Sequence, residues 1–157
     1  MSEEELRVRK IKRGTVIDHI SAGNALNVLK ILGISGKEGY VVSISINVPS
    51  KKFGKKDIVK VEERELDPKE VDKIALLAPN ATINIVRNYR VVDKQRVKLP
   101  DELEGFPRCI NPSCVVNSGE PIEPKFSVDS KEPVRLRCRY CTRVMEQEDI
   151  IEQFASE

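Results

Sequence analysis

The four cysteines of this 157-residue chain all lie in its last third, in the pairs CINPSC (109–114) and CRYC (138–141). Each pair has the short spacing of a metal-binding knuckle, and four thiolates suit zinc in a closed tetrahedral site. The segment 101–157 is also too short for a self-sufficient hydrophobic core and needs a staple of this kind. The spacing therefore predicts one structural zinc ion with four ligands: Cys109, Cys114, Cys138 and Cys141.

Three other interpretations of the cysteines stay open on spacing alone: a pair of disulfides, a CxxC redox centre and four unrelated thiols. A redox CxxC lies at a helix N-terminus after a strand, and nothing around CRYC requires that arrangement. The N-terminal MSEEELRVRK has no apolar signal core, and no apolar run approaches the ~20 residues of a membrane span. We therefore expect a cytoplasmic protein without a membrane partner, in which metal chemistry is more common than disulfides.

The chain begins with a strand pattern followed by a helix pattern. Residues 6–20 place β-forming apolar residues among charges, interrupted by KRG, and predict one extended segment. Apolar residues then recur at helical spacing over 25–32, which predicts a helix with Ser21 as its N-cap. Gly33 follows at the position where a residue of positive φ commonly ends a helix.

The next stretch, YVVSISINV (40–48), alternates between apolar and polar residues and predicts a half-buried strand. The side chains expected on its buried face are Val42, Ile44, Ile46 and Val48. A basic loop at 50–56 leads to a second strand, DIVKVEEREL (57–66). We expect the two strands to pair as an antiparallel hairpin.

A second helix is predicted to begin at Asp67-Pro68, because aspartate is a good N-cap and proline suits the first helical position. Pro79 ends it, and the alternating residues 81–87 predict another strand. Asn88 is expected to kink the chain before a further extended piece at 89–93. The order strand, helix, strand, strand, helix, strand is that of a ferredoxin-like, or split βαβ, sheet with two helices on one face.

After residue 95 the aliphatic alternation disappears, and prolines, cysteines and arginines replace it. We expect three short strands and a final helix there, at 125–130, 134–138, 143–147 and 146–154. The predicted fold class is α+β. It combines an N-terminal ferredoxin-like domain over 1–100 with a small C-terminal all-β zinc-binding domain over 101–157.

The charge balance does not predict general nucleic-acid binding, because 27 basic residues face 25 acidic ones and the net charge is +2. Arginines nevertheless surround the second cysteine knuckle, at Arg135, Arg137, Arg139 and Arg143. They leave three possibilities open: a solvated face, a docking surface for an acidic partner, or a nucleic-acid-binding zinc ribbon. The last is the main alternative function.

The only histidine, His19, follows Asp18, and the pair raises the question of catalysis. Neighbours on a strand point to opposite faces, so Asp18 is not expected to orient the ring of His19. The chain also has no glycine-rich phosphate loop and no paired nucleophile. A small acylphosphatase-like enzyme on this fold is therefore the least favoured class.

Several longer stretches carry a more specific resemblance. IKRGTVIDHI, GKKDIVKVE, LAPNATINIVRNYRVV and the two cysteine knuckles occur in this order, from about residue 6 to residue 155. Together they resemble the regulatory chain of aspartate carbamoyltransferase.

That resemblance implies a non-catalytic allosteric subunit of pyrimidine biosynthesis. In this family, dimers of regulatory chains link catalytic trimers, and the zinc domain docks on the catalytic chain. The N-terminal domain binds nucleotide effectors, with CTP as inhibitor, ATP as activator and UTP as a candidate third effector. Nucleic acid is not an expected partner.

The resemblance also implies the residues of the effector site. Asp18 would accept hydrogen bonds from the ribose hydroxyls, while His19 and Lys94 would lie near the phosphates. Lys60 would reach the base and sugar, and Lys56 matches a basic position linked to a second nucleotide. Further residues would line the site or present main-chain groups to the base: Val8, Ile11, Val16, Asn84, Tyr89 and Val91. Arg9, Lys10 and Arg90 make this region more basic than in better-known bacterial members.

Overall fold

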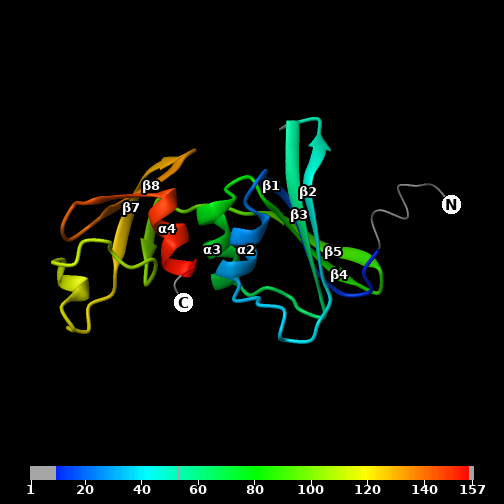
Figure 1. The fold of residues 1–157 in the computed structure, drawn as a ribbon, viewed down its shortest axis with the longest axis horizontal. Coiled ribbons are helices and arrows are strands. Elements are labelled where there is room, and N and C mark those ends of the chain that lie inside the picture. Colours follow the sequence, from blue (N-terminus) through cyan, green and yellow to red (C-terminus); the bar gives the residue numbers. More distant parts are fainter. Residues whose placement is uncertain (1–9, 53, 156–157) are drawn as a thin grey trace.

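The computed structural model describes residues 10–52 and 54–155, and within them two antiparallel sheets enclose a layer of helices (Figure 1). The N-terminal sheet has five strands in the order β2-β3-β1-β4-β5. Its elements are β1 (Gly14–Ser21), α2 (Ala25–Ile31), β2 (Val42–Ser50), β3 (Gly54–Glu62), α3 (Pro68–Leu77), β4 (Thr82–Arg87) and β5 (Arg90–Arg96). The first four strands have the ferredoxin-like order, so the predicted α+β class is confirmed.

The C-terminal part is a four-stranded sheet in the order β6-β7-β8-β9. Its elements are β6 (Glu102–Glu104), the 3₁₀ turn η1 (Val115–Asn117), β7 (Lys125–Lys131), β8 (Val134–Cys138), β9 (Val144–Glu146) and α4 (Gln147–Ala155). Helix α4 turns back from this sheet and packs against α2 and α3, as Figure 1 shows. Its amide Gln147 Nε2 donates to the carbonyl oxygens of Leu76 and Leu77, at the end of α3.

Several local predictions are confirmed. The α3 N-terminus is a capping box: Glu70 N–H donates to the Asp67 carboxylate (2.9 Å), and Asp67 N–H donates to that of Glu70 (3.2 Å). Gly33, with φ 71°, ends the first helix in a Schellman motif, because its own N–H reaches the Lys30 carbonyl and the next N–H reaches that of Leu29.

The predicted N-cap of α2 was wrong. Ser21 is the last residue of β1, and Asn24 occupies the N-cap position without a side-chain cap. The buried carboxylate of Asp57 takes over this role from β3, since it accepts the N–H groups of Gly23 (3.0 Å) and Ala25 (3.1 Å). It also accepts the N–H of Asn47 (3.0 Å), so one carboxylate fixes the start of α2 and a bend in β2.

Strand β2 also departs from its expected alternation. Its pairing with β3 shifts between Ser45 and Val48, where Asn47 has φ 60°. Because β2 lies at the sheet edge, Ile44 and Ile46 keep 37% and 51% of their surface exposed instead of being buried. Strand β3 starts at Gly54, inside the expected basic loop, and ends at Glu62 rather than at residue 66.

The expected kink at Asn88 is a full reversal of the chain. Asn88 and Tyr89 both have positive φ (52° and 64°), as the two central residues of a type I′ turn do. The extended piece that follows is therefore a separate fifth strand, β5, paired antiparallel with β4.

Candidate functional site

The four cysteines form one cluster, in which the Sγ atoms all lie within 4.8 Å of one another. Two of the separations are 3.5 Å (Cys109–Cys141) and 3.7 Å (Cys114–Cys138). A tetrahedral Zn²⁺ with Zn–S bonds near 2.3 Å places its sulfurs about 3.8 Å apart, so these thiols fit a single ion. All four are free cysteines, which excludes the disulfide interpretation for this structure.

Electrostatics within the cluster support a bound cation. Burial raises the pKa of Cys109 and of Cys114, so neutral thiols are favoured there without a metal. In contrast, the backbone N–H of Arg143 lowers the pKa of Cys141 to about 6. Cys141 is therefore the thiol of the cluster that loses its proton most readily, and a bound divalent cation would stabilise the thiolate forms of the others.

The strands and turns around the cluster hold it in place. Cys138 is the last residue of β8 and pairs with the buried Phe126 of β7. On the first knuckle, Asn117 Nδ2 donates to the carbonyl oxygens of Cys109 (2.9 Å) and Asn111 (2.8 Å). With four thiolate ligands the site has no open position for water, so its zinc is structural.

The face of the N-terminal sheet opposite its helices carries a second group of predicted residues. Strand register places Lys94 opposite Asn84, Asn84 opposite Val16, and Val16 opposite Lys60. These four residues form one row across β5, β4, β1 and β3. Because neighbouring strands lie about 4.7–4.9 Å apart, the row spans roughly 14 Å from Lys94 on β5 to Lys60 on β3.

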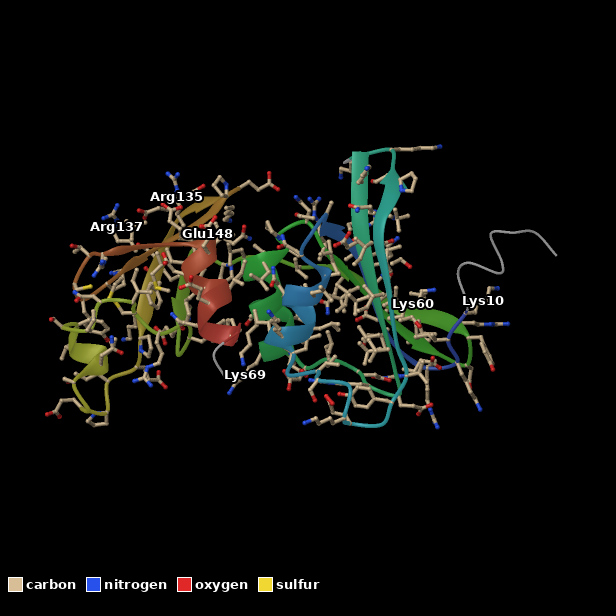
Figure 2. All side chains as sticks on the ribbon, viewed as in Figure 1. Lys10, Lys60, Lys69, Arg135, Arg137 and Glu148 are labelled. Carbon is tan, nitrogen blue, oxygen red and sulfur yellow. The ribbon has the colours of Figure 1, made fainter. Side chains whose placement is uncertain are left out.

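A hollow of about 370 Å³ lies over three residues of this row, Val16, Asn84 and Lys60, while Lys94 at the end of the row is not part of its lining. Its lining includes seven of the predicted site residues: Ile11, Val16, Asp18, Lys60, Asn84, Tyr89 and Val91. Lys10 also lines it, and Figure 2 shows Lys10 and Lys60 on the helix-free side of the sheet. Burial lowers the pKa of Lys60, and the charge of Asp18 opposes that effect.

Asp18 and Lys56 form a close ion pair next to the row. Lys56 Nζ lies 2.9 and 3.2 Å from the two carboxylate oxygens of Asp18, and both side chains are largely buried. Asn84 Nδ2 donates to the carbonyl oxygen of Val16 (3.2 Å). These contacts hold one carboxylate and one amide in fixed positions at the hollow.

The remaining predicted residues lie elsewhere. His19 lines a separate hollow of about 420 Å³, with Lys55 and Asn80 among its neighbours. Its φ of 58° belongs to a bulge in β1, which brings Nδ1 to 3.9 Å from the Asp18 carboxylate and 3.2 Å from Thr82 Oγ1. The ring nitrogen is thus closer to Thr82 than to Asp18, and the two neighbours line different hollows, as expected for residues that follow one another on a strand. Val8 lies outside the described residues.

Two apolar residues of the hollow were missed at the sequence level. Ile58 lies two positions before Lys60 on β3, and Val86 lies two positions after Asn84 on β4. The period of two in a strand places each pair on one face, so the alternation could have identified both residues.

The arginines near the second knuckle are mostly paired with acids. Arg135 contacts Glu146 (3.2 Å), Arg137 contacts Asp129 (2.9 Å) and Arg139 contacts Glu102 (2.6 Å). Figure 2 shows Arg135 and Arg137 together on the C-terminal sheet. Because the charges of these three arginines are locally balanced, they do not form the unpaired positive stripe that phosphate backbones attract.

Fold and sites together define a two-part α+β protein, with a hollow on the helix-free face of one sheet and a four-cysteine metal centre beside the other. Comparison with known proteins agrees with both parts. Residues 6–98 match the family model described as "Aspartate carbamoyltransferase regulatory chain, allosteric domain". Residues 101–151 match the model for the "metal binding domain" of the same chain.

Curated relatives carry the name "Aspartate carbamoyltransferase regulatory chain". The protein from Methanothrix thermoacetophila is 65% identical over 141 residues, covering 90% of this chain and 92% of the relative. The protein from Korarchaeum cryptofilum is 57% identical, and the match covers 98% of each chain. The protein from Pyrococcus furiosus is 55% identical, and the match covers 94% of this chain and 97% of the relative. The chain belongs to the family of aspartate carbamoyltransferase regulatory chains. Among the described residues, no helix is long and apolar enough to cross a membrane.

Proposed function

We propose that this chain is a non-catalytic subunit that binds nucleoside triphosphates on the helix-free face of its N-terminal sheet. CTP acts as inhibitor and ATP as activator, with UTP as a candidate third effector. The observation that carries the proposal is a hollow of about 370 Å³ lined by Asn84, Val16 and Lys60, with Lys94 next in the same row across the sheet.

The chemistry of this row suits a nucleotide. Lys94 at one end provides a cation for the phosphates, and Lys60 at the other end lies in the hollow beside Asp18. The Asp18 carboxylate, already oriented by Lys56, is an acceptor for ribose hydroxyls. Ile11, Tyr89 and Val91 line the hollow, and the family resemblance assigns the reading of the base to their main-chain groups. Such groups distinguish an amino group from a carbonyl, because the wrong base leaves a buried donor or acceptor without a hydrogen bond.

The other surfaces support the assembly that the family implies. Residues 101–157 act as the zinc domain that docks on the catalytic chain, and Val115 and Tyr140 are exposed beside the cysteines. The open edge of β2, with exposed Ile44 and Ile46, suits pairing with a second copy of this chain. Such dimers would link catalytic trimers in pyrimidine biosynthesis. Four free thiols in one metal cluster favour the cytoplasm as the compartment.

Replacing Lys94 with alanine is expected to weaken CTP and ATP binding about 10- to 100-fold, because one charge-assisted hydrogen bond to phosphate contributes about 1.5–3 kcal/mol. Isothermal titration of the full chain with each nucleotide measures the change, and zinc content should stay the same. Lys69→Ala is the matched control, since Lys69 is an exposed lysine on α3, outside the hollow. Equal affinities in the Lys94 variant and the unaltered chain would place the phosphates elsewhere.

The assembly is tested by purification from the source cell with a tag on this chain. A carbamoyl-transferring chain should be recovered in stoichiometric amount, and the isolated regulatory chain should not catalyse that transfer. Recovery of RNA or DNA in its place, with affinity that falls steeply with salt, would favour the zinc-ribbon alternative.

A further inference from the structure

Asn80 joins the two parts of the molecule. It lies between α3 and β4, and its Nδ2 donates to the Glu132 carboxylate in the turn between β7 and β8. Its Oδ1 accepts a hydrogen bond from Arg96 Nη2 (3.0 Å) on β5. A single amide thus connects the α3–β4 loop and strand β5 of the N-terminal part with the β7–β8 turn of the zinc-bearing sheet.

Arg96 lies close to the phosphate end of the proposed nucleotide site. Strand register places Lys94 opposite Asn84 and Arg96 opposite Thr82, so both cations belong to the helix-free face of β5. Two residues along a strand correspond to roughly 7 Å. A polyphosphate held by Lys94 would therefore lie within the electrostatic range of the Arg96 guanidinium.

A second connection reaches Asn80 from β1. His19 Nδ1 lies 3.2 Å from Thr82 Oγ1, and Thr82 lies two residues from Asn80. His19 and Asn80 also line the same hollow of about 420 Å³, which leaves the amide space to change its conformation. His19, which is expected near the phosphates, thus lies in the same hollow as Asn80 and contacts a residue two positions from it.

We propose that Arg96, Asn80 and Glu132 form a hydrogen-bonded relay that transmits nucleotide occupancy from the effector site to the zinc-bearing sheet. This inference rests on the proposed nucleotide function. A bound polyphosphate attracts the Arg96 guanidinium and competes with Asn80 for it. Asn80 then changes its contact with Glu132, and the β7–β8 turn shifts between two arrangements. In these terms Arg96 responds to the phosphates directly, while Asn80 and Glu132 are positioning residues of the allosteric response that do not contact the effector.

The test compares Glu132→Ala with Glu132→Gln. Alanine removes the acceptor for Asn80 Nδ2, whereas glutamine keeps an amide oxygen in that position without the charge. Hydrogen exchange of residues 130–134 is measured in the full chain with and without saturating CTP. In parallel, the activity of the reconstituted complex is measured with and without CTP and ATP.

We expect the unaltered chain and Glu132→Gln to show a CTP-dependent change in exchange at 130–134 of at least threefold. Glu132→Ala should lose that change and at least two thirds of the nucleotide effect on activity. Its CTP dissociation constant, measured on the full chain, should remain within twofold. Glu123→Ala serves as control, because Glu123 is an acidic residue of the same C-terminal part whose side chain has no contact with Asn80 among those described.

Each failure has a distinct cause. If the unaltered chain does not bind CTP, the proposed nucleotide function itself is wrong. If CTP binds and Glu132→Ala keeps the full exchange change and nucleotide effect, the relay is wrong and the function stands. Loss of the response in Glu132→Gln as well, with unchanged CTP affinity, would show that the hydrogen bond is not the coupling element and would also overturn the relay.

Discussion

Replacing Cys114 with serine is expected to release the zinc ion and unfold the C-terminal sheet. Cys114 is buried, and its Sγ lies 3.7 Å from that of Cys138. Zinc bound to a four-thiolate site contributes on the order of 10 kcal/mol or more to apparent folding free energy, comparable to the ~5–15 kcal/mol stability of a whole domain. Metal analysis should fall from one zinc per chain to nearly none, and amide protection in β7 and β8 should disappear.

Ser113→Ala is the matched control, because Ser113 lies in the same knuckle with an exposed side chain that is not a ligand. It should retain a full equivalent of zinc. Removing the metal from the unaltered protein with a chelator and a thiol-binding mercurial should likewise separate it from the catalytic chain. A complex that survives complete metal loss would contradict the docking role of this region.

The second large effect is expected at Gly14, which has φ 139° at the start of β1. A Cβ on this residue would lie 2.1 Å from the backbone carbonyl oxygen of Val61 and 2.9 Å from Cα of Glu62. Neither backbone atom can move away without separating β1 from β3. We expect Gly14→Ala to lower the free energy of unfolding by about 3 kcal/mol or more, and Tm by roughly 10 °C.

Nucleotide binding should weaken in the same variant, because β1 carries Val16 and Asp18 while β3 carries Lys56 and Lys60. Gly23→Ala separates the strain of a positive φ from the steric contact of the added Cβ. Gly23 has φ 96°, but a Cβ there would meet nothing within 4 Å. That control should cost only about 1 kcal/mol, from backbone conformation alone. The free energy of unfolding of both variants is measured by urea denaturation. A similar decrease in the two variants would show that the backbone around Val61 accommodates the added Cβ with little loss of stability.

The zinc centre was predictable because ligand spacing and thiolate chemistry are local properties of the sequence. Helix α3 was predictable for the same reason, since its capping box and its terminating proline are adjacent to its ends. The fifth strand was missed because its turn requires positive φ at both Asn88 and Tyr89, and tyrosine rarely adopts that conformation. The bend in β2 was missed because it depends on Asp57, ten residues further along the chain.

The nucleotide hollow was only partly predictable. Alternation alone assigns Lys60 and Asn84 to polar faces, but not to the same row, because a row is set by the register between strands. That register became known only with the fold, which places Asn84, Val16 and Lys60 side by side across three strands. The resemblance to a family supplied most of the individual residues, since it already contains the information about register.

The return of α4 onto α2 and α3 affects how this protein can be dissected. Leu76 and Leu77 are fully buried, and Gln147 binds their carbonyl groups from the far end of the polypeptide. A fragment that stops at residue 100 lacks α4, so it would expose the apolar surface of α2 and α3 that α4 covers. The carbonyl oxygens of Leu76 and Leu77 would also lose their hydrogen bonds to Gln147. Such a fragment should self-associate through the exposed surface. To keep the N-terminal part from aggregating on its own, α4 must be added as a separate peptide or fused to the fragment.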